Sequence, residues 1–260
     1  MIKIKGENLP FTKLLPNIVT LASLCIGLTA IKCAIFGEFV QATALLLTAG
    51  FMDGVDGRLA RFLNSTSDFG AQLDSLVDFV NFGVVPGFII YSWVNSYDDI
   101  AGFNWIMVLF FAICGAIRLA RFNVDLSRDV ENPILEKYFF KGVPIPCGAA
   151  LTMLPMVLTY EFGDNFYSNP VLVITYTMVL GVLMASRVPT ISIKRIPVKN
   201  DYVYLTLLVL GLIIAGLFTK PWITLAIVGI TYASTIPMTI FAFVKITLSQ
   251  DRHQSNRHHR

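Results

Sequence analysis

Long apolar segments recur along the whole chain, and short polar segments separate them. Each apolar segment has about the 20 residues that a helix needs to cross a hydrocarbon core about 30 Å thick. We therefore predict an all-α, polytopic membrane protein with eight spans. A short seventh span is expected either to tilt or to form a tight hairpin with the eighth around Lys220 and Pro221. The predicted spans are 16–36, 39–58, 72–96, 103–121, 142–160, 170–186, 203–218 and 221–245.

The composition agrees with this pattern and excludes an ordinary soluble protein. Of the 260 residues, 55% are hydrophobic and 14% are charged, and the mean hydropathy is +0.67. Soluble domains carry about 25% charged residues. The four cysteines lie scattered in apolar stretches without a CxxC pair, so we expect neither a disulfide framework nor a zinc site. The polar first residues do not resemble a removable signal peptide.

The positive charges indicate how the spans are oriented. With the eight predicted spans, 18 of the 20 Lys and Arg residues fall on one side of the membrane. Positively charged loops stay in the cytoplasm. We therefore expect both termini on the cytoplasmic side of the inner membrane of a prokaryote, which requires an even number of spans.

The chain divides into three predicted parts. Residues 1–200 form a membrane domain, residues 201–248 add two transmembrane helices, and residues 249–260 form a polar tail that we expect to be disordered. The amino-terminal segment LPFTKLLPN is either a short interfacial helix or an irregular lead-in. Three histidines of the tail could bind a metal, but a solvated tail is the favoured interpretation.

The segment 52–78 holds five of the seventeen acidic residues, although it lies between apolar spans. Asp53 and Asp56 are three residues apart near the end of the second span, and Asp74 and Asp78 are four apart at the start of the third. Each pair therefore shares one helix face. Two antiparallel helices can bring the four carboxylates together, where they would repel each other unless a cation binds. Oxygen ligands of this kind suit hard divalent cations such as Mg²⁺.

Residues beside the aspartates suit a diphosphate. A missing Cβ at Gly57 lets a ligand approach the backbone, and Arg61, one turn further on, can reach a phosphate with its guanidinium. Metal, arginine and glycine together indicate a pyrophosphate site. The alternative is a structural charge cluster in which, for instance, Asp56 pairs with Arg61.

The aspartate segment resembles the signature of the CDP-alcohol phosphotransferase family. The match begins with DGVDGRLAR and covers eight positions in 26 residues: Asp53, Asp56, Gly57, Ala60, Arg61, Gly70, Asp74 and Asp78. This resemblance implies a six-helix membrane core that transfers a substituted phosphate from a CDP-linked donor to an alcohol and releases CMP.

The resemblance also implies roles for single residues. Asp53, Asp56 and Asp74 would hold one metal ion, and Asp53, Asp74 and Asp78 a second, with Mg²⁺ or Mn²⁺ as the ions. Asp78 would also act as the general base. Two further residues, Gly57 and Arg61, would contact the CDP portion of the donor, and Ser67 is a weaker candidate for the same contact.

Four further blocks narrow the acceptor: LPNIVT (15–20), RLARFN (118–123), FKGVPIP (140–146) and SRVPTISIKR (186–195). Their order, over about residues 10–200, is similar to the bacterial and archaeal branch of the family that makes phosphatidylserine from CDP-diacylglycerol and L-serine. Members of the family are often homodimers, which implies a dimer here. The same chemistry with glycerol 3-phosphate, inositol phosphate or choline as acceptor, or with an ether-lipid donor, remains an alternative.

Charged and polar residues in these blocks are candidates for substrate binding. Arg118, Arg121 and Lys141 can bind the serine carboxylate or a phosphate, or they can anchor the chain at lipid phosphates. Asn17 and Thr20 can bind the nucleotide or cap the first helix. A divalent-cation transporter is a different reading of the aspartates, but all four lie at one membrane level, which favours the enzyme.

Overall fold

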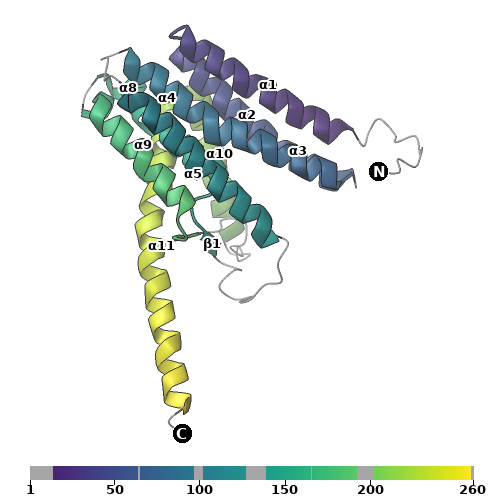
Figure 1. Ribbon diagram of the computed structural model, residues 1–260, viewed down its shortest axis with the longest axis vertical. Coiled ribbons are helices and arrows are strands. Elements are labelled where there is room, and N and C mark those ends of the chain that lie inside the picture. Colours follow the sequence, from purple (N-terminus) through teal and green to yellow (C-terminus); the bar gives the residue numbers. More distant parts are fainter. Residues whose placement is uncertain are drawn as a thin grey trace. The chain divides into compact units, whose positions relative to one another are not determined.

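The computed structural model describes residues 14–63, 65–96, 102–126, 139–164, 166–191 and 202–258, and it is mostly helical (Figure 1). Each of the eight predicted spans coincides with helix. The chain forms two compact units, Met1–Leu119 and Ala120–Arg260. Of the predicted amino-terminal segment LPFTKLLPN (9–17), residues 9–13 lie outside the described residues, and residues 15–17 belong to the first turn of the helix Leu15–Ile35.

In the first unit, α1 packs against α2, α3 and α4. The elements of this unit are α1 (Leu15–Ile35), α2 (Phe39–Phe62), α3 (Asp68–Asp78), the π-helix η2 (Phe79–Val84), α4 (Val85–Asn95) and most of α5 (Phe103–Leu126). Ser67 begins α3 as its N-cap, because its side-chain oxygen accepts a hydrogen bond from the Gly70 N–H at 3.0 Å. Such a cap stabilises a helix by about 1 kcal/mol.

The buried face of α1 is a stripe of small residues. Its members recur alternately four and three residues apart, which keeps them on one side of the helix. They are Pro16, Thr20, Ser23, Gly27, Ala30 and Ala34. Small side chains let membrane helices approach closely, so this stripe places the backbone of α1 against α2 and the helix that follows it.

The third predicted span is one helical rod with an internal irregularity. Residues 68–95 are helical throughout, but the middle turn η2 is a π-helix in which the Val85 N–H donates to the Val80 carbonyl. Pro86 lies directly after this turn. Its ring has no N–H and clashes with the carbonyl four residues earlier, and a locally wider turn relieves that clash. α5 packs on α4, where Gly87 lies next to Phe111.

The second unit contains the remaining helices. They are α7 (Ile145–Thr152), α8 (Leu154–Phe162), the 3₁₀ turn η3 (Phe166–Ser168), α9 (Pro170–Ala185), α10 (Val203–Thr219) and α11 (Pro221–His258). The fifth predicted span is therefore divided into α7 and α8 at Met153, just before Pro155. α9 starts at Asn169, whose side chain accepts hydrogen bonds from two backbone N–H groups of the first turn.

Two short strands were not expected from the sequence. β1 (Phe139–Lys141) pairs antiparallel with β2 (Pro189–Ile191), and Phe140 lies opposite Thr190. Gly142 follows β1 with a φ of +85°, and its N–H donates to the Val188 carbonyl at 2.8 Å. This pairing brings the predicted blocks FKGVPIP and SRVPTISIKR side by side.

The carboxyl-terminal tail also differs from expectation. α11 continues as one helix through Pro237 to His258, so residues 249–258 are helical and not disordered. Extending an existing helix adds one hydrogen bond per residue without a new nucleation cost. The expectation of disorder rested on the polar composition of the tail alone and did not take the preceding helix into account.

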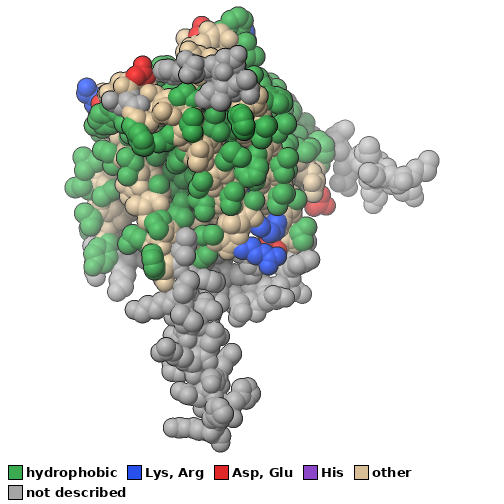
Figure 2. Space-filling view, turned by 60° about the vertical axis from the view of Figure 1, so that its left-hand side comes forward, with side chains coloured by type: hydrophobic (Ala, Val, Ile, Leu, Met, Phe, Trp, Pro, Cys, Tyr) green, Lys and Arg blue, Asp and Glu red, His purple; other side chains and the backbone are tan. Residues whose placement is uncertain are grey.

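Within the described residues, five helices are long and apolar enough to cross a membrane, and two shorter helices, 170–185 and 203–219, are also apolar. The five are Leu15–Ile35, Asp68–Asn95, Phe103–Asp125, Ile145–Phe162 and Pro221–Thr239. Hydrophobic side chains cover most of the described surface in Figure 2. The chain is therefore a polytopic helical membrane protein.

The surroundings of Gly142 generate a prediction about stability. A Cβ at this position would lie 2.7 Å from the Ser186 carbonyl and 2.9 Å from that of Met184, on a backbone with positive φ. We expect Gly142→Ala to destabilise the protein by about 1–3 kcal/mol. Thermal unfolding in detergent measures the change. Gly211→Ala is the matched control, because a Cβ there meets no described atom within 4 Å; an equal loss in both variants would contradict the prediction.

Candidate metal centre

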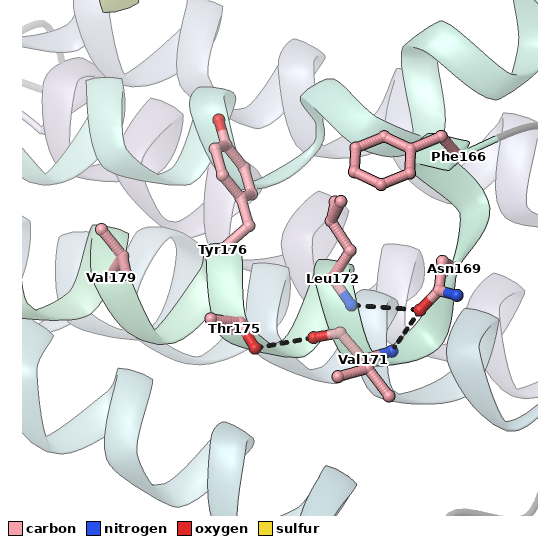
Figure 3. Close-up of a pocket in the computed structure, with 7 residues that line it drawn as sticks. All are labelled: Phe166, Asn169, Val171, Leu172, Thr175, Tyr176 and Val179. Atoms are coloured by element: carbon pink, nitrogen blue, oxygen red, sulfur yellow. Dashed lines mark hydrogen bonds between the residues drawn. The ribbon is translucent and has the colours of Figure 1, made fainter.

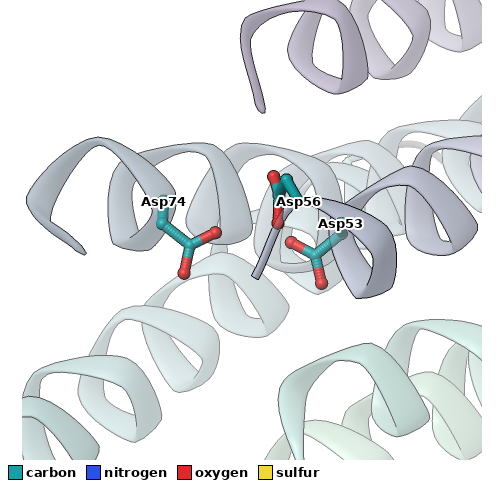
Figure 4. A group of neighbouring side chains, drawn as sticks. All are labelled: Asp53, Asp56 and Asp74. Atoms are coloured by element: carbon teal, nitrogen blue, oxygen red, sulfur yellow. The ribbon is translucent and has the colours of Figure 1, made fainter. Parts of the chain in front are cut away.

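The predicted aspartates converge. Asp53 and Asp56 lie on α2 and Asp74 lies on α3, and one carboxylate oxygen of each falls within 4.8 Å of the others (Figure 4). Spacing along each helix and the approach of the end of α2 to α3 together produce this cluster, as the sequence predicts.

Asp78, one turn beyond Asp74, belongs to the same cluster. Its carboxyl group comes within hydrogen-bonding reach of that of Asp53, and it experiences the negative charge of the other three aspartates. Its Oδ1 atom is buried and has no hydrogen-bond partner among the described residues. A buried carboxylate oxygen without a donor is unfavourable unless a cation meets it.

Asp56 is the most buried member of the cluster, with 3% of its surface exposed. Its Oδ2 accepts a hydrogen bond of 2.7 Å from the Thr20 hydroxyl of α1. Its Oδ1 is also buried and has no partner among the described residues. The threonine thus fixes one oxygen of the carboxylate and leaves the other for a ligand.

These residues fit a site for divalent cations. All the converging ligand atoms are carboxylate oxygens, which Mg²⁺ and Mn²⁺ prefer. Two of the oxygens are buried without a donor, and four negative groups in one place repel each other. Asp53, Asp56, Asp74 and Asp78 would hold the ions.

The approach to the cluster is open on one side. Cβ atoms built at Gly54 and Gly57 would meet no described atom within 4 Å. Arg61 is exposed, and its Nε donates to the Gly57 carbonyl at 3.1 Å. Arg61 and Asp56 therefore each have another partner, and the structural pair between them that the sequence allowed is not formed.

The candidates near the start of α3 lie together. Besides capping α3, Ser67 faces Gly70, where a Cβ would lie 3.0 Å from Asn17 Oδ1 and 3.1 Å from Ser67 Oγ. The N-cap of α1 is Leu14, so Asn17 and Thr20 do not cap that helix. Gly70 is needed because α1 and the turn before α3 approach each other here.

Arg118 and Arg121 differ in their surroundings. Arg118 is buried, with 6% of its surface exposed. Arg121 donates to the carbonyls of Ala185 and Ser186 at 2.8 Å, and to that of Met184 at 3.4 Å. Its guanidinium thus satisfies carbonyl groups at the end of α9. The side chain of Lys141 lies outside what the structure describes.

Two polar residues near the cluster escaped the sequence analysis. Ser23 and Asn81 are both fully buried, and the Asn81 amide donates to Ser23 Oγ at 2.9 Å. The sequence spacing could have identified them, because Ser23 lies one turn after Thr20 and Asn81 lies three residues after Asp78, so each shares a helix face with a candidate site residue.

A hollow of about 580 Å³ lies along α9 in the second unit (Figure 3). It is lined mainly by apolar groups, such as Phe166, Leu172 and Val179, and by the ring of Tyr176, whose hydroxyl donates to the Leu151 carbonyl at 3.0 Å. Its lining residues include no charged side chain. The hollow therefore lacks the groups that phosphate chemistry needs.

Comparisons with known proteins agree with the aspartate signature. Residues 13–185 match the family model of the CDP-alcohol phosphatidyltransferases, and residues 201–237 match a second model, CDP-alcohol phosphatidyltransferase 2. A CDP-diacylglycerol–serine O-phosphatidyltransferase of Mycobacterium bovis is 34% identical over 91% of this chain and 80% of its own length. The enzyme of that name from Helicobacter pylori is 33% identical over 92% and 96%, respectively. The enzyme of that name from Methanocaldococcus jannaschii is 32% identical over 76% and 82%.

The cluster geometry predicts how a metal binds. Asp74→Asn removes one charge and one ligand from the cluster, so we expect the affinity for Mn²⁺ to fall by about tenfold or more. Loss of the electron paramagnetic resonance signal of free Mn²⁺ measures binding to the purified protein. Asp68→Asn is the matched control, because Asp68 is exposed at the start of the same helix. Equal Mn²⁺ affinities of the two variants would contradict the assignment of Asp74 as a ligand.

Proposed function

Because this chain belongs to the CDP-alcohol phosphatidyltransferase family, we propose that it transfers the phosphatidyl group of CDP-diacylglycerol to the hydroxyl of L-serine, giving phosphatidylserine and CMP. The convergence of the four aspartates carries this proposal, because the transfer needs a site that binds a diphosphate and accepts a proton. The choice of serine is supported by the names of the relatives from two bacterial groups and an archaeon.

Asp53, Asp56, Asp74 and Asp78 are the proposed ligands of two Mg²⁺ or Mn²⁺ ions. When bound, such ions neutralise the charge of the diphosphate and of the departing phosphate. Thr20 holds Asp56 in the orientation that leaves its second oxygen free.

The donor binds beside the cluster. Gly57 is open to solvent, so the cytidine diphosphate portion can lie against the backbone of α2. Arg61 is exposed one turn further on and offers the guanidinium N–H groups that it does not use on the Gly57 carbonyl. Asn17 and Ser67 flank Gly70 at the start of α3, where we place them beside the nucleotide.

Asp78 is the proposed general base. It takes the proton from the serine hydroxyl, and the serine oxygen forms a bond to the phosphorus that carries diacylglycerol. The bond between this phosphorus and the oxygen of the cytidylate phosphate breaks, and CMP leaves with the electron pair. Arg61 stabilises the negative charge that develops on the leaving group.

Serine is a zwitterion and needs a cation for its carboxylate. Arg118 and Lys141 are the proposed carboxylate-binding residues. Arg121 donates to three backbone carbonyls. We therefore propose that it holds the end of α9 and the segment that leads into β2 in place, and that it does not bind the substrate directly.

In the membrane, we propose eight spans with both termini and the aspartate cluster on the cytoplasmic side of a prokaryotic inner membrane, and a homodimer as the assembly. The distribution of Lys and Arg supports this orientation. Labelling single cysteines at positions 63 and 250 with a reagent that cannot cross the membrane tests it, since both should react only from the cytoplasmic side.

The acceptor is tested by incubating the purified protein with CDP-diacylglycerol, Mg²⁺ or Mn²⁺ and one alcohol at a time. We expect CMP release with L-serine and none with glycerol 3-phosphate, inositol phosphate or choline. Omission of the alcohol is the control for hydrolysis of the donor. Release with glycerol 3-phosphate but not with serine would overturn the choice of acceptor while leaving the family chemistry intact.

The role of Asp78 predicts a separation of turnover from binding. Asp78→Asn keeps the size of the side chain but cannot take up the proton, so we expect kcat to fall by about 100-fold or more. Binding of CDP-diacylglycerol, measured on the same preparation, should persist. Asp68→Asn serves as the control and should retain wild-type turnover. Substantial turnover by Asp78→Asn would remove Asp78 from the role of base.

A further inference from the structure

The π-helix η2 lies between the two aspartates of α3 and the packed helix α4. In it the Val85 N–H donates to the carbonyl of Val80, five residues earlier. Such a turn contains one more residue than an α-helical turn. Contacts made by η2 itself therefore contribute to the direction in which α3 presents Asp74 and Asp78, beside the packing of α3 and α4 on α1.

Asn81, in the middle of η2, makes such a contact. It is fully buried, and its Nδ2 donates to Ser23 Oγ of α1 at 2.9 Å. Ser23 Oγ in turn donates to the Ala49 carbonyl of α2 at 3.0 Å. Because a serine hydroxyl has one hydrogen and gives it to Ala49, only its lone pair is left for Asn81. The arrangement therefore requires the amide NH₂ of Asn81 at this point and joins η2, α1 and α2.

The stripe on α1 has a gap for this amide. A Cβ at Gly27 would lie 2.1 Å from Asn81 Oδ1 and 2.9 Å from Asn81 Cγ. No side chain fits at position 27 while Asn81 keeps its place. Gly27 thus lets η2 approach α1 closely enough for the hydrogen bond to Ser23.

The same stripe also holds the metal cluster. Thr20, one turn before Ser23, donates to Asp56. Asn81 is three residues after Asp78, so a rotation of η2 moves Asp78 with it. One face of α1 therefore fixes Asp56 through Thr20 and the helix that carries Asp74 and Asp78 through Ser23.

We propose that Asn81 is a positioning residue for the aspartate cluster: its hydrogen bond to Ser23, in the space left by Gly27, fixes the rotation of η2 and so brings the carboxylates of α3 to those of α2. This inference rests on the metal role assigned to the aspartates under the proposed function. It adds a residue outside the family signature that acts through the ligands and touches neither substrate nor metal.

Asn81→Ala tests the proposal, with Mn²⁺ binding to the purified protein as the readout. We expect the Kd for Mn²⁺ to rise by about tenfold or more, as loss of residues that orient metal ligands usually does. Asn104→Ala is the matched control. Asn104 is 2% exposed and donates to Asn95 at 2.5 Å, and Asn95 lies about 25 Å along the helix from Asp78. Thermal unfolding of both variants measures how much stability each one loses, so that the two Kd values are compared at a known stability.

Ser23→Ala provides a second variant, which removes only the hydroxyl group. Ser23→Ala should also raise the Kd for Mn²⁺. The double variant Ser23→Ala/Asn81→Ala should have a Kd no higher than the higher Kd of the two single variants, because both changes break the same hydrogen bond. If Asn81→Ala does not yield folded protein, Ser23→Ala decides the question.

Wild-type affinity in Asn81→Ala, or in Ser23→Ala where only that variant folds, would overturn the proposal. A loss of affinity in Asn104→Ala as large as that in Asn81→Ala would also overturn it. Failure of the wild-type protein to bind Mn²⁺ is a different result, since it would remove the metal role from the proposed function itself.

Discussion

Repulsion between carboxylates is the constraint on which the first unit depends. Four aspartates approach one another at the end of α2 and along α3. Separated carboxylates would be more favourable for an isolated pair of helices. The packing of α1 on both helices, through a stripe of small residues, opposes this separation. The fold thus holds together a cluster of acidic groups that a bound cation would stabilise.

The sequence predicted the helices and the cluster because both depend on local periodicity. Apolar length located the eight main helical segments, and the spacing of the aspartates along two helices predicted the convergence of Asp53, Asp56 and Asp74. The same periodicity could not reveal η2. A π-turn adds one residue without changing the polar pattern, and its cause, the ring of Pro86 within a helical rod, is also compatible with a simple kink.

Contacts between distant segments were less accessible to sequence analysis. The pairing of β1 with β2 joins residues about 50 positions apart, and three residues per strand give too short a pattern to detect. Arg121 illustrates the same limit. Its position in RLARFN made it a candidate for binding an anion, and in the structure its guanidinium donates to backbone carbonyls at the end of α9. In the second unit these contacts bring together parts of three of the four blocks that suggested the acceptor.

The order of residues on the buried face of α1 has a consequence for assembly in the bilayer. Lipid tails are as apolar as the helix surface, so the hydrophobic effect does not distinguish one axial register of two packed helices from another. A slip of α1 by one turn, about 5.4 Å, would bring Gly27 to the Ala49 carbonyl and the methyl group of Ala30 to the Asn81 amide. The Asn81 amide would then lose its acceptor, and the Ala49 carbonyl would lose the hydrogen bond from the Ser23 hydroxyl. Thr20, Ser23 and Gly27, in this order, therefore favour one register of α1 over a register displaced by one turn.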